Sequence, residues 1–307
     1  MAPVLHVADR DINVSSLDKE LFPDDHVSKG DMLLHYGTVA EAMVPHLAGR
    51  PLTLRRYPHG IGTEGFFQKH PAGLPEWMHV VEIAHKRSEG SDPYVVCDEA
   101  ATLLYLANLT AIEFHIWTAT TPDIERPDRL VIDIDPPAGV TVAELRSVAR
   151  RARDLCTEIG LTPFLQATGG RGYHVVTPLD RSADFGFVRA LAGGITDRLA
   201  AADPERLTTA FRKNQRGDRI FLDANRNGYG QTFVAPYSLR ARPGAAVATP
   251  LDWSELGRST PDGYTTASIG RRLARKTDPW ADMDDHAAVP AEARERLDAL
   301  DGGAKAA

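Results

Sequence analysis

The most informative stretch of the chain is Arg129-Leu-Val-Ile-Asp-Ile-Asp-Pro-Pro137. In a β-strand, Asp133 and Asp135 share one face, while the apolar residues that alternate with them face a core. The two prolines end the strand and leave both carboxylates at its tip. Adjacent carboxylates repel one another, and a divalent cation that prefers oxygen ligands neutralises them. The stretch predicts a Mg²⁺ or Mn²⁺ site, although a strand end with solvated acids has the same pattern.

Helices and strands alternate on both sides of this strand, which predicts an α+β (mixed α/β) fold. Capping boxes begin helices at Ser28 and at Thr141, where an acidic residue follows three positions later. Further helices are expected over 98–111, capped by Asp98, and over 185–201. The other strands are expected over residues 52–57, 113–117, 173–177, 219–223 and 232–236.

Composition places the chain among soluble folded proteins, because 43% of its 307 residues are hydrophobic and 25% are charged. Two cysteines, Cys97 and Cys156, are too few for a disulfide framework or a Cys-rich zinc site, which indicates a reducing compartment. No run approaches the ~18 apolar residues of a membrane span, and the N-terminus lacks a signal-peptide pattern. We expect a cytoplasmic protein without a membrane partner.

The net charge of −7 is unevenly distributed. Residues 278–307 carry eight acids and three bases, so the rest of the chain has a net charge of only −2. This break predicts one catalytic domain over 1–277 and an acidic C-terminal helix and tail over 278–307. Within the first part, Arg206–Arg219 holds five basic residues and one acid, a local patch that suits phosphate as well as a solvated face.

A second motif, Thr168-Gly-Gly-Arg-Gly-Tyr-His174, combines three glycines with an arginine just before a predicted strand. Glycines let backbone amides approach an anion closely, so the turn suits a triphosphate. It is neither a Walker loop nor a dinucleotide fingerprint, because no Gly-Lys-Ser/Thr follows and the loop precedes a strand. An ordinary glycine turn is the alternative.

A third motif, Arg219-Ile-Phe-Leu-Asp223, again ends a strand on a carboxylate. Three carboxylates from two strands, with a phosphate-binding turn between them in the sequence, predict a nucleotidyl-transfer site. A metal-dependent glycosyltransferase that uses Asp133 and Asp135 on a nucleotide-sugar is an alternative, but it leaves Asp223 without a role.

The sequence resembles the primase-polymerase domain of bacterial ATP-dependent DNA ligase D, within the archaeo-eukaryotic primase superfamily. The resemblance extends from about residue 12 to residue 275. It is carried by Leu17-Asp-Lys-Glu-Leu-Phe-Pro23, Val27-Ser-Lys-Gly-Asp31, Gly49-Arg-Pro-Leu-Thr53, Gly65-Phe-Phe-Gln-Lys69, Glu113-Phe-His115, Ile132-Asp-Ile-Asp-Pro136, Gly169-Gly-Arg-Gly-Tyr-His174 and Ala235-Pro-Tyr-Ser-Leu-Arg240. It implies a primase-like catalytic core with central antiparallel or mixed sheets flanked by helices.

The resemblance also implies site residues. Two Mn²⁺ or Mg²⁺ ions are expected on the catalytic carboxylates Asp133, Asp135 and Asp223. The incoming NTP or dNTP is expected to contact Thr168, Arg171, His174, Arg240 and His115. The 5′-phosphate of a DNA end is expected on Lys19 and Lys29, the template base on Phe66 and Phe67, and an end-ordering loop around Arg216.

The activity implied is nucleotide addition, with a preference for ribonucleotides, to a primer 3′-hydroxyl at gapped or broken DNA ends. Non-homologous end joining is the expected setting, with Ku and a separate ATP-dependent DNA ligase, since the adenylation motif Lys-x-Asp-Gly is absent from the sequence. Gap filling in excision repair, and a non-catalytic module that binds 5′-phosphate ends and bridges them, stay open as alternatives. Residues 79–94 are expected to form a hairpin that helps two DNA ends meet.

Overall fold

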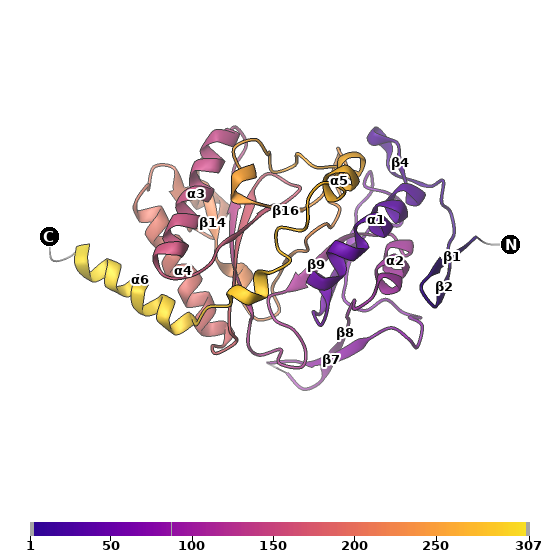
Figure 1. Ribbon diagram of the computed structural model, residues 1–307, viewed down its shortest axis with the longest axis horizontal. Helices are drawn as coiled ribbons and strands as arrows, with labels where there is room; N and C mark the ends of the chain where they lie inside the picture. The colour runs from indigo at the N-terminus through magenta and orange to yellow at the C-terminus, as the bar shows by residue number, and fades with distance from the viewer. Residues whose placement is uncertain (1–2, 87, 305–307) are drawn as a thin grey trace. The chain divides into compact units, whose positions relative to one another are not determined.

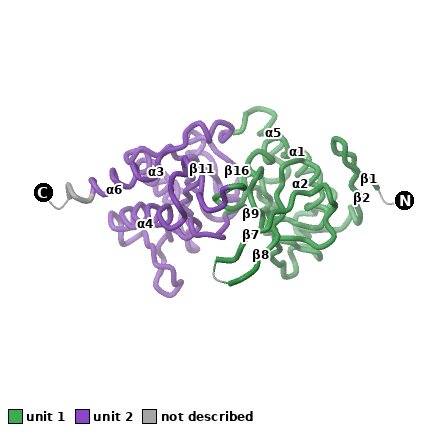
Figure 2. The backbone as a smooth tube through the Cα atoms, turned by 90° about the horizontal axis from the view of Figure 1, so that it is seen from below, with its two compact units in different colours: residues 1–122, 233–249, 264–278 green, residues 123–232, 250–263, 279–307 purple. Residues whose placement is uncertain are grey.

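The structure is a computed structural model that describes residues 3–86 and 88–304 (Figure 1). The chain divides into two compact units, each made of three separate segments (Figure 2). Unit 1 comprises residues 1–122, 233–249 and 264–278. Unit 2 comprises residues 123–232, 250–263 and 279–307.

The described part of unit 2 is built on a six-stranded sheet with the strand order β13-β14-β10-β12-β11-β16. Strand β10 is antiparallel to both of its neighbours, whereas β13 runs parallel to β14, so the sheet is mixed. The strands are β10 (Arg129–Asp135), β11 (Phe164–Ala167), β12 (Tyr173–Pro178), β13 (Leu207–Thr208), β14 (Ile220–Asp223) and β16 (Thr249–Leu251). The helices are α3 (Val142–Glu158), α4 (Phe185–Ala201), α6 (Pro290–Ala304) and the 3₁₀ turns η2 (Lys213–Gln215), η3 (Asn225–Asn227), η4 (Trp253–Glu255) and η5 (Met283–His286).

Strand β10 has the predicted bounds and the predicted two faces. Leu130, Ile132 and Ile134 are fully buried, and helices α3 and α4 both pack against the strand. Helix α3 begins as expected, because the Thr141 hydroxyl accepts a hydrogen bond from the Glu144 amide while the Glu144 carboxylate accepts one from the Thr141 amide. The apolar alternation of β10 therefore fixes which face carries the aspartates.

The described part of unit 1 is built on a four-stranded sheet with the order β15-β9-β5-β6. Its strands are β5 (Leu52–Arg56), β6 (Phe66–Gln68), β9 (Ala111–Trp117) and β15 (Thr232–Val234), and smaller pairs are β1 (Val4–Val7) with β2 (Arg10–Asn13), β3 (Glu20–Phe22) with β4 (Val27–Ser28), and β7 (Val80–Ala84) with β8 (Ser91–Val95). Its helices are η1 (Pro23–Asp25), α1 (Lys29–Leu47), α2 (Ala100–Asn108) and α5 (Thr266–Leu273). The antiparallel pair β7–β8 confirms the hairpin predicted over 79–94, in which Arg87 lies outside the described residues.

Two predicted helices keep their expected start, and one does not. Helix α1 begins with the predicted capping box of Ser28 and Asp31, and α4 occupies the predicted residues. Helix α2 is shorter than predicted, and its N-cap is Glu99 rather than Asp98. The Asp98 carboxylate instead accepts a hydrogen bond from the Gly49 amide and contacts His79, so it joins two loops. Among the helices of the described residues, none is both long and apolar enough to cross a membrane.

The chain after residue 277 packs into the two units. In unit 1, the Asp278 carboxylate accepts a hydrogen bond from the Tyr237 hydroxyl at 2.8 Å. In unit 2, the Trp280 indole is buried and donates to the Leu165 carbonyl oxygen, and α6 packs on α4. A helix is present as expected, and the domain boundary between 277 and 278 stays a prediction. Residues 305–307 lie outside the described residues.

Candidate functional site

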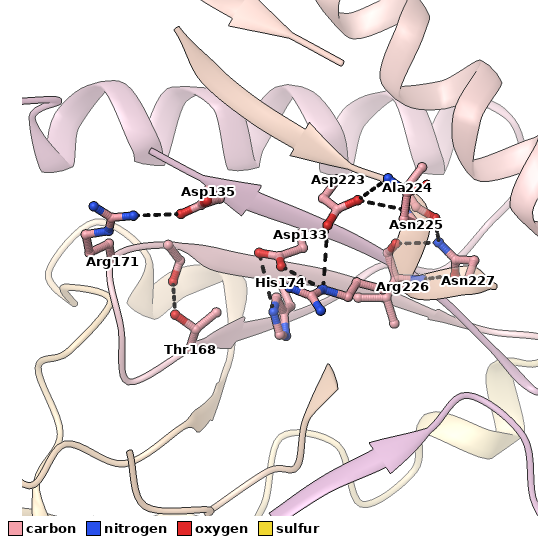
Figure 3. A network of polar contacts seen from close by, with 12 residues as sticks. Asp133, Asp135, Thr168, Arg171, His174, Asp223, Ala224, Asn225, Arg226 and Asn227 are labelled. Atoms are coloured by element: carbon pink, nitrogen blue, oxygen red, sulfur yellow. Dashed lines mark hydrogen bonds and ion pairs between the residues drawn. The ribbon is translucent and has the colours of Figure 1, made fainter. Parts of the chain in front are cut away.

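A row of polar side chains crosses the sheet of unit 2 on one face (Figure 3). Asp133 on β10 lies directly opposite Asp223 on β14 and, on its other side, opposite His174 on β12. Gln166 on β11 continues the row beyond His174. The Asp133 and Asp223 side chains are only 13% and 12% exposed, so the carboxylates face one another where little water can screen them.

Asp133 is the centre of this row and lies close to both His174 and Arg226. Its two oxygens lie 3.5 Å from His174 Nε2 and 3.1 Å from Arg226 Nε. Burial alone would raise the pKa of Asp133, but His174 and Arg226 outweigh burial and hold this pKa at about 2. Asp133 is therefore ionised at neutral pH.

Asp135 lies two residues further along β10, at the exposed end of the strand. Burial and the negative charge of Asp133 raise the pKa of Asp135, while Arg171 and Arg216 act in the opposite direction. Arg171 lies 3.4 Å and Arg216 3.8 Å from the Asp135 carboxylate. The repulsion between adjacent aspartates that the sequence predicts is thus present, and arginines compensate for it.

Asp223 is held by the turn that follows it. The Asn225 backbone amide and side-chain amide both donate to Asp223 Oδ1 at 2.8 Å. The Asn227 side chain is fully buried and bonds to both the amide and the carbonyl of Val131 on β10. This locks η3 against the strand and brings Arg226 Nε within 3.7 Å of Asp223 Oδ2. Arg226 was not among the predicted site residues, although Asn225-Arg226-Asn227 follows the third carboxylate after a single alanine.

The chemistry of this donor set fits divalent cations, because its oxygens are hard ligands, Asp133 is ionised and Asp135 is destabilised by its neighbour. As the side chains lie, however, no three His, Cys, Asp or Glu residues of the described chain are arranged to hold a metal ion. The guanidinium of Arg226 lies between two of the carboxylates (Figure 3).

The glycine turn 168–172 is tied down mostly by its own backbone. The Thr168 hydroxyl donates to the Gly172 carbonyl oxygen and accepts from the Gly170 amide, while the Gly169 amide donates to Pro261. A Cβ on Gly172 would lie 1.8 Å from the Ile134 carbonyl oxygen, so this glycine permits close packing against β10. The backbone amides of residues 168–170 thus have hydrogen-bond partners within the protein. The exposed Arg171 is the part of the turn that faces Asp135.

Arg216 follows η2 and organises the loop before β14. Its guanidinium donates to the carbonyl oxygens of Ala210 and Phe211, lies over the Phe221 ring at 3.5 Å and reaches towards Asp135. The loop arginine expected from the resemblance is therefore linked to a carboxylate of the polar row.

In unit 1, Glu113 is the hub of a second polar cluster. This carboxylate is 2% exposed on β9, lies 2.8 Å from His115 Nε2 and accepts a hydrogen bond from the Ala241 amide at 2.9 Å. Arg240 and Arg55 each approach it to 3.5 Å. Burial would raise the pKa of Glu113, but His115, Arg240 and the Ala241 amide hold it at about 2. Glu113 thus orients both His115 and Arg240, in a structural role beside them.

The two phenylalanines lie on β6, an edge strand of the unit 1 sheet. Phe66 and Phe67 are 45% and 65% exposed, so both rings face solvent, whereas the alternation of a strand requires only one to do so. Arg56 lies over the Phe66 ring and Arg55 over the Phe67 ring, each at 5.5 Å. Cations therefore flank both aromatic faces, as in proteins that stack on nucleic-acid bases.

The two lysines converge, although they are ten residues apart. Lys29 is 4% exposed, and its ammonium donates to the Ser15 carbonyl oxygen at 2.8 Å. Burial and the nearby charge of Lys19 lower the pKa of Lys29. A buried ammonium beside a second lysine favours an anionic ligand that neutralises both charges.

Comparisons with known proteins identify the family. The model of the LigD primase-polymerase domain matches residues 28–280. The chain belongs to the LigD primase-polymerase domain family. The crystallographic relative "Polymerase Domain from Mycobacterium tuberculosis Ligase D in complex with DNA" is 33% identical, with a TM-score of 0.83 over 90% of this chain and 99% of that one. This match confirms the predicted α+β, primase-like fold.

Full-length LigD proteins are similar to the chain over part of their length. "Multifunctional non-homologous end joining DNA repair protein LigD" of Mycobacterium tuberculosis (H37Rv) is 34% identical over 287 residues, which are 91% of this chain and 38% of that protein. "Bifunctional non-homologous end joining protein LigD" of Bacillus subtilis is 31% identical over 275 residues, 89% of this chain and 44% of that protein. The chain thus spans less than half the length of these LigD relatives.

The site residues expected from the LigD resemblance fall into separate groups. Seven lie together in unit 2: Asp133, Asp135, Asp223, Thr168, Arg171, His174 and Arg216. Six lie in unit 1, as the pairs His115 with Arg240, Lys19 with Lys29, and Phe66 with Phe67. The Phe67 and His115 rings meet edge to face at 6.1 Å, which joins two of these pairs. The functional roles of all thirteen stay predictions.

Proposed function

We propose that the protein is a DNA-repair primase-polymerase, a nucleotidyltransferase that adds nucleotides to a primer 3′-hydroxyl at gapped or broken DNA ends. The observation that carries this proposal is the row of Asp223, Asp133 and His174 across three neighbouring strands, with Asp135 at the strand tip. Nucleotidyl transfer needs such carboxylates together with positive groups for a triphosphate.

Asp133, Asp135 and Asp223 would hold two Mn²⁺ or Mg²⁺ ions. When bound, the ions would lower the pKa of the attacking hydroxyl and neutralise charge on the departing pyrophosphate. The protein's own groups bind the triphosphate, through the exposed Arg171 and through His174 beside Asp133. The primer 3′-oxygen then forms a bond to the α-phosphorus as the bond to pyrophosphate breaks, and the hydroxyl proton leaves to solvent.

The residues of unit 1 would bind the rest of the substrate. Arg240 and His115, both held by Glu113, would contact the incoming nucleotide. Lys19 and Lys29 would bind the 5′-phosphate on the far side of a gap, and their proximity supports this role. Phe66 and Phe67 would stack on the template base, where each aromatic contributes about 1–3 kcal/mol.

The setting we propose is non-homologous end joining in the cytoplasm, at the nucleoid. Its support is that the similar LigD proteins carry end joining in their names and that the similar polymerase domain was solved with DNA. A preference for ribonucleotides, cooperation with Ku and ligation by a separate ATP-dependent ligase belong to the same proposal.

Gap filling in excision repair would use the same residues and is the nearest alternative. A non-catalytic module that binds and bridges 5′-phosphate ends is also compatible with the buried Lys29 beside Lys19. That module has no use for Asp133, Asp135 and Asp223, whereas the charge network around them is extensive.

Primer extension on gapped DNA with a 5′-phosphate tests the proposal, with Mn²⁺ and either ribo- or deoxyribonucleotides. We expect template-directed addition, faster with ribonucleotides, that is lost in Asp133→Ala. Tight binding to the gap without any addition would favour the bridging module instead. Equal addition by wild type and Asp133→Ala would show that the carboxylate row is not the active site.

A further inference from the structure

Arg226 lies where a cation between the carboxylates would bind. Its Nε is 3.1 Å from Asp133 Oδ2 and 3.7 Å from Asp223 Oδ2, and these two residues face one another across neighbouring strands. The guanidinium thus bridges two carboxylates that would otherwise repel one another (Figure 3). We propose that Arg226 is a built-in counter-cation, which holds the carboxylates together before metal binds and competes with the metal for them.

Hydrogen bonds on both sides of Arg226 fix the turn that presents its side chain to the carboxylates. Asn225 is bonded to Asp223 and Asn227 to the backbone of Val131, so the residues on both sides of Arg226 are anchored to the strands that carry the aspartates. The Arg226 side chain itself is 40% exposed. It can therefore withdraw into solvent by side-chain rotation while the turn stays in place.

Charge explains why the arrangement favours exchange. The single guanidinium between the two carboxylates carries one positive charge, whereas a divalent ion in the same place carries two. An arginine cannot lose its proton at any physiological pH, so it must be displaced rather than neutralised. Metal affinity is consequently lowered by the interaction that the guanidinium gives up.

The other arginines around Asp135 do not have this position. Arg171 and Arg216 lie 3.4 and 3.8 Å from the Asp135 carboxylate, and in the described ion pairs neither bridges two aspartates. The inference therefore concerns Arg226 specifically, and it rests on the proposed function because it assumes that the carboxylates bind divalent ions.

Mn²⁺ binding without DNA or nucleotide tests this inference, with free Mn²⁺ measured by electron paramagnetic resonance. We expect Arg226→Gln to bind the first Mn²⁺ about tenfold more tightly than wild type, which corresponds to about 1.4 kcal/mol. Without metal, we expect this variant to unfold at a lower temperature than wild type. We expect Mn²⁺ to raise the unfolding temperature of the variant more than that of wild type. Arg189→Gln is the matched control, because exposed Arg189 bonds to Asn225 in the same turn without contacting a carboxylate.

The outcomes separate the inference from the function beneath it. Unchanged or weaker Mn²⁺ binding in Arg226→Gln, with binding lost in Asp133→Asn, would overturn the counter-cation role and leave the metal site standing. Mn²⁺ binding that Asp133→Asn does not alter would remove the metal site itself. If Arg226→Gln does not fold, nuclear magnetic resonance of the wild-type protein provides the test instead, through the Nε–H resonance of Arg226. We expect that resonance to shift with the same midpoint as Mg²⁺ binding, and an unmoved resonance would refute displacement.

Discussion

Replacing Glu113 by glutamine tests whether the buried hub of unit 1 stabilises the fold through its charge. Glutamine has nearly the same shape and can still accept the hydrogen bond from the Ala241 amide. It resembles the protonated acid, so the comparison isolates the interaction of the carboxylate with His115 and Arg240.

The magnitude follows from the pKa of Glu113, which falls from an ordinary 4.5 to about 2 in the folded protein. Because the folded pKa is depressed, the stabilisation is fully present above the unfolded pKa and is lost as the pH falls through the folded one. Linkage gives about 3 kcal/mol at pH 7 and a decrease of about 2 kcal/mol by pH 3. For a chain of this size we expect Glu113→Gln to unfold about 5 °C lower than wild type at pH 7.

Urea unfolding followed by circular dichroism at pH 7, 5 and 3 measures this difference, since titrating groups that do not contact Glu113 cancel between wild type and variant. Glu41→Gln on the exposed face of α1 is the control, and we expect it to follow wild type at every pH. A gap between wild type and Glu113→Gln that stays constant from pH 7 to pH 3, or that is below about 1 kcal/mol at pH 7, would refute the reasoning.

Two further substitutions test other parts of the structure. Gly172→Ala places a methyl group 1.8 Å from the Ile134 carbonyl oxygen, so we expect insoluble protein or a free energy of unfolding lower by about 4 kcal/mol. The control Gly257→Ala, with open space around it, should unfold as wild type does. An unaffected Gly172→Ala would mean that the turn does not pack against β10. Lys29→Met removes the buried ammonium, so we expect about tenfold weaker binding to gapped DNA with a 5′-phosphate and unchanged binding to gapped DNA with a 5′-hydroxyl. Fluorescence anisotropy measures both affinities, and we expect the control Lys276→Met to change neither. Equal losses on both DNAs would argue against a phosphate pocket.

Sequence patterns predicted helices and strands well where the deciding residues are neighbours in the chain. The bounds of β10 follow from strict alternation ended by two prolines, and α3 and α1 follow from their capping boxes. Asp98 shows the limit of such signals, because a side chain suited to capping found partners in Gly49 and His79 instead. Helix-capping propensity depends only on neighbouring residues, so it does not show that distant groups compete for the Asp98 side chain.

The electrostatics of the site could not be predicted, because its contacts join distant parts of the chain. Arg226 meets Asp133 across 93 positions, and the Ala241 amide meets Glu113 across 128. The glycine motif illustrates a different gap. Its pattern indicated close approach by an anion, whereas Gly172 is required by close approach of the neighbouring strand. The glycines indicate that another group approaches the backbone closely, and only the tertiary packing shows which group that is.

The interleaving of the two units has a consequence for how the protein can be divided. Over residues 3–304, the chain passes from one unit to the other five times, so each unit is completed by segments that return from the other. No single cut releases either unit whole. Ending the chain at residue 277 would remove Asp278 from Tyr237 and Trp280 from the core beside Leu165, damaging both halves at once. The carboxylate row and the Glu113 hub therefore cannot be separated into two fragments by one cut in the chain.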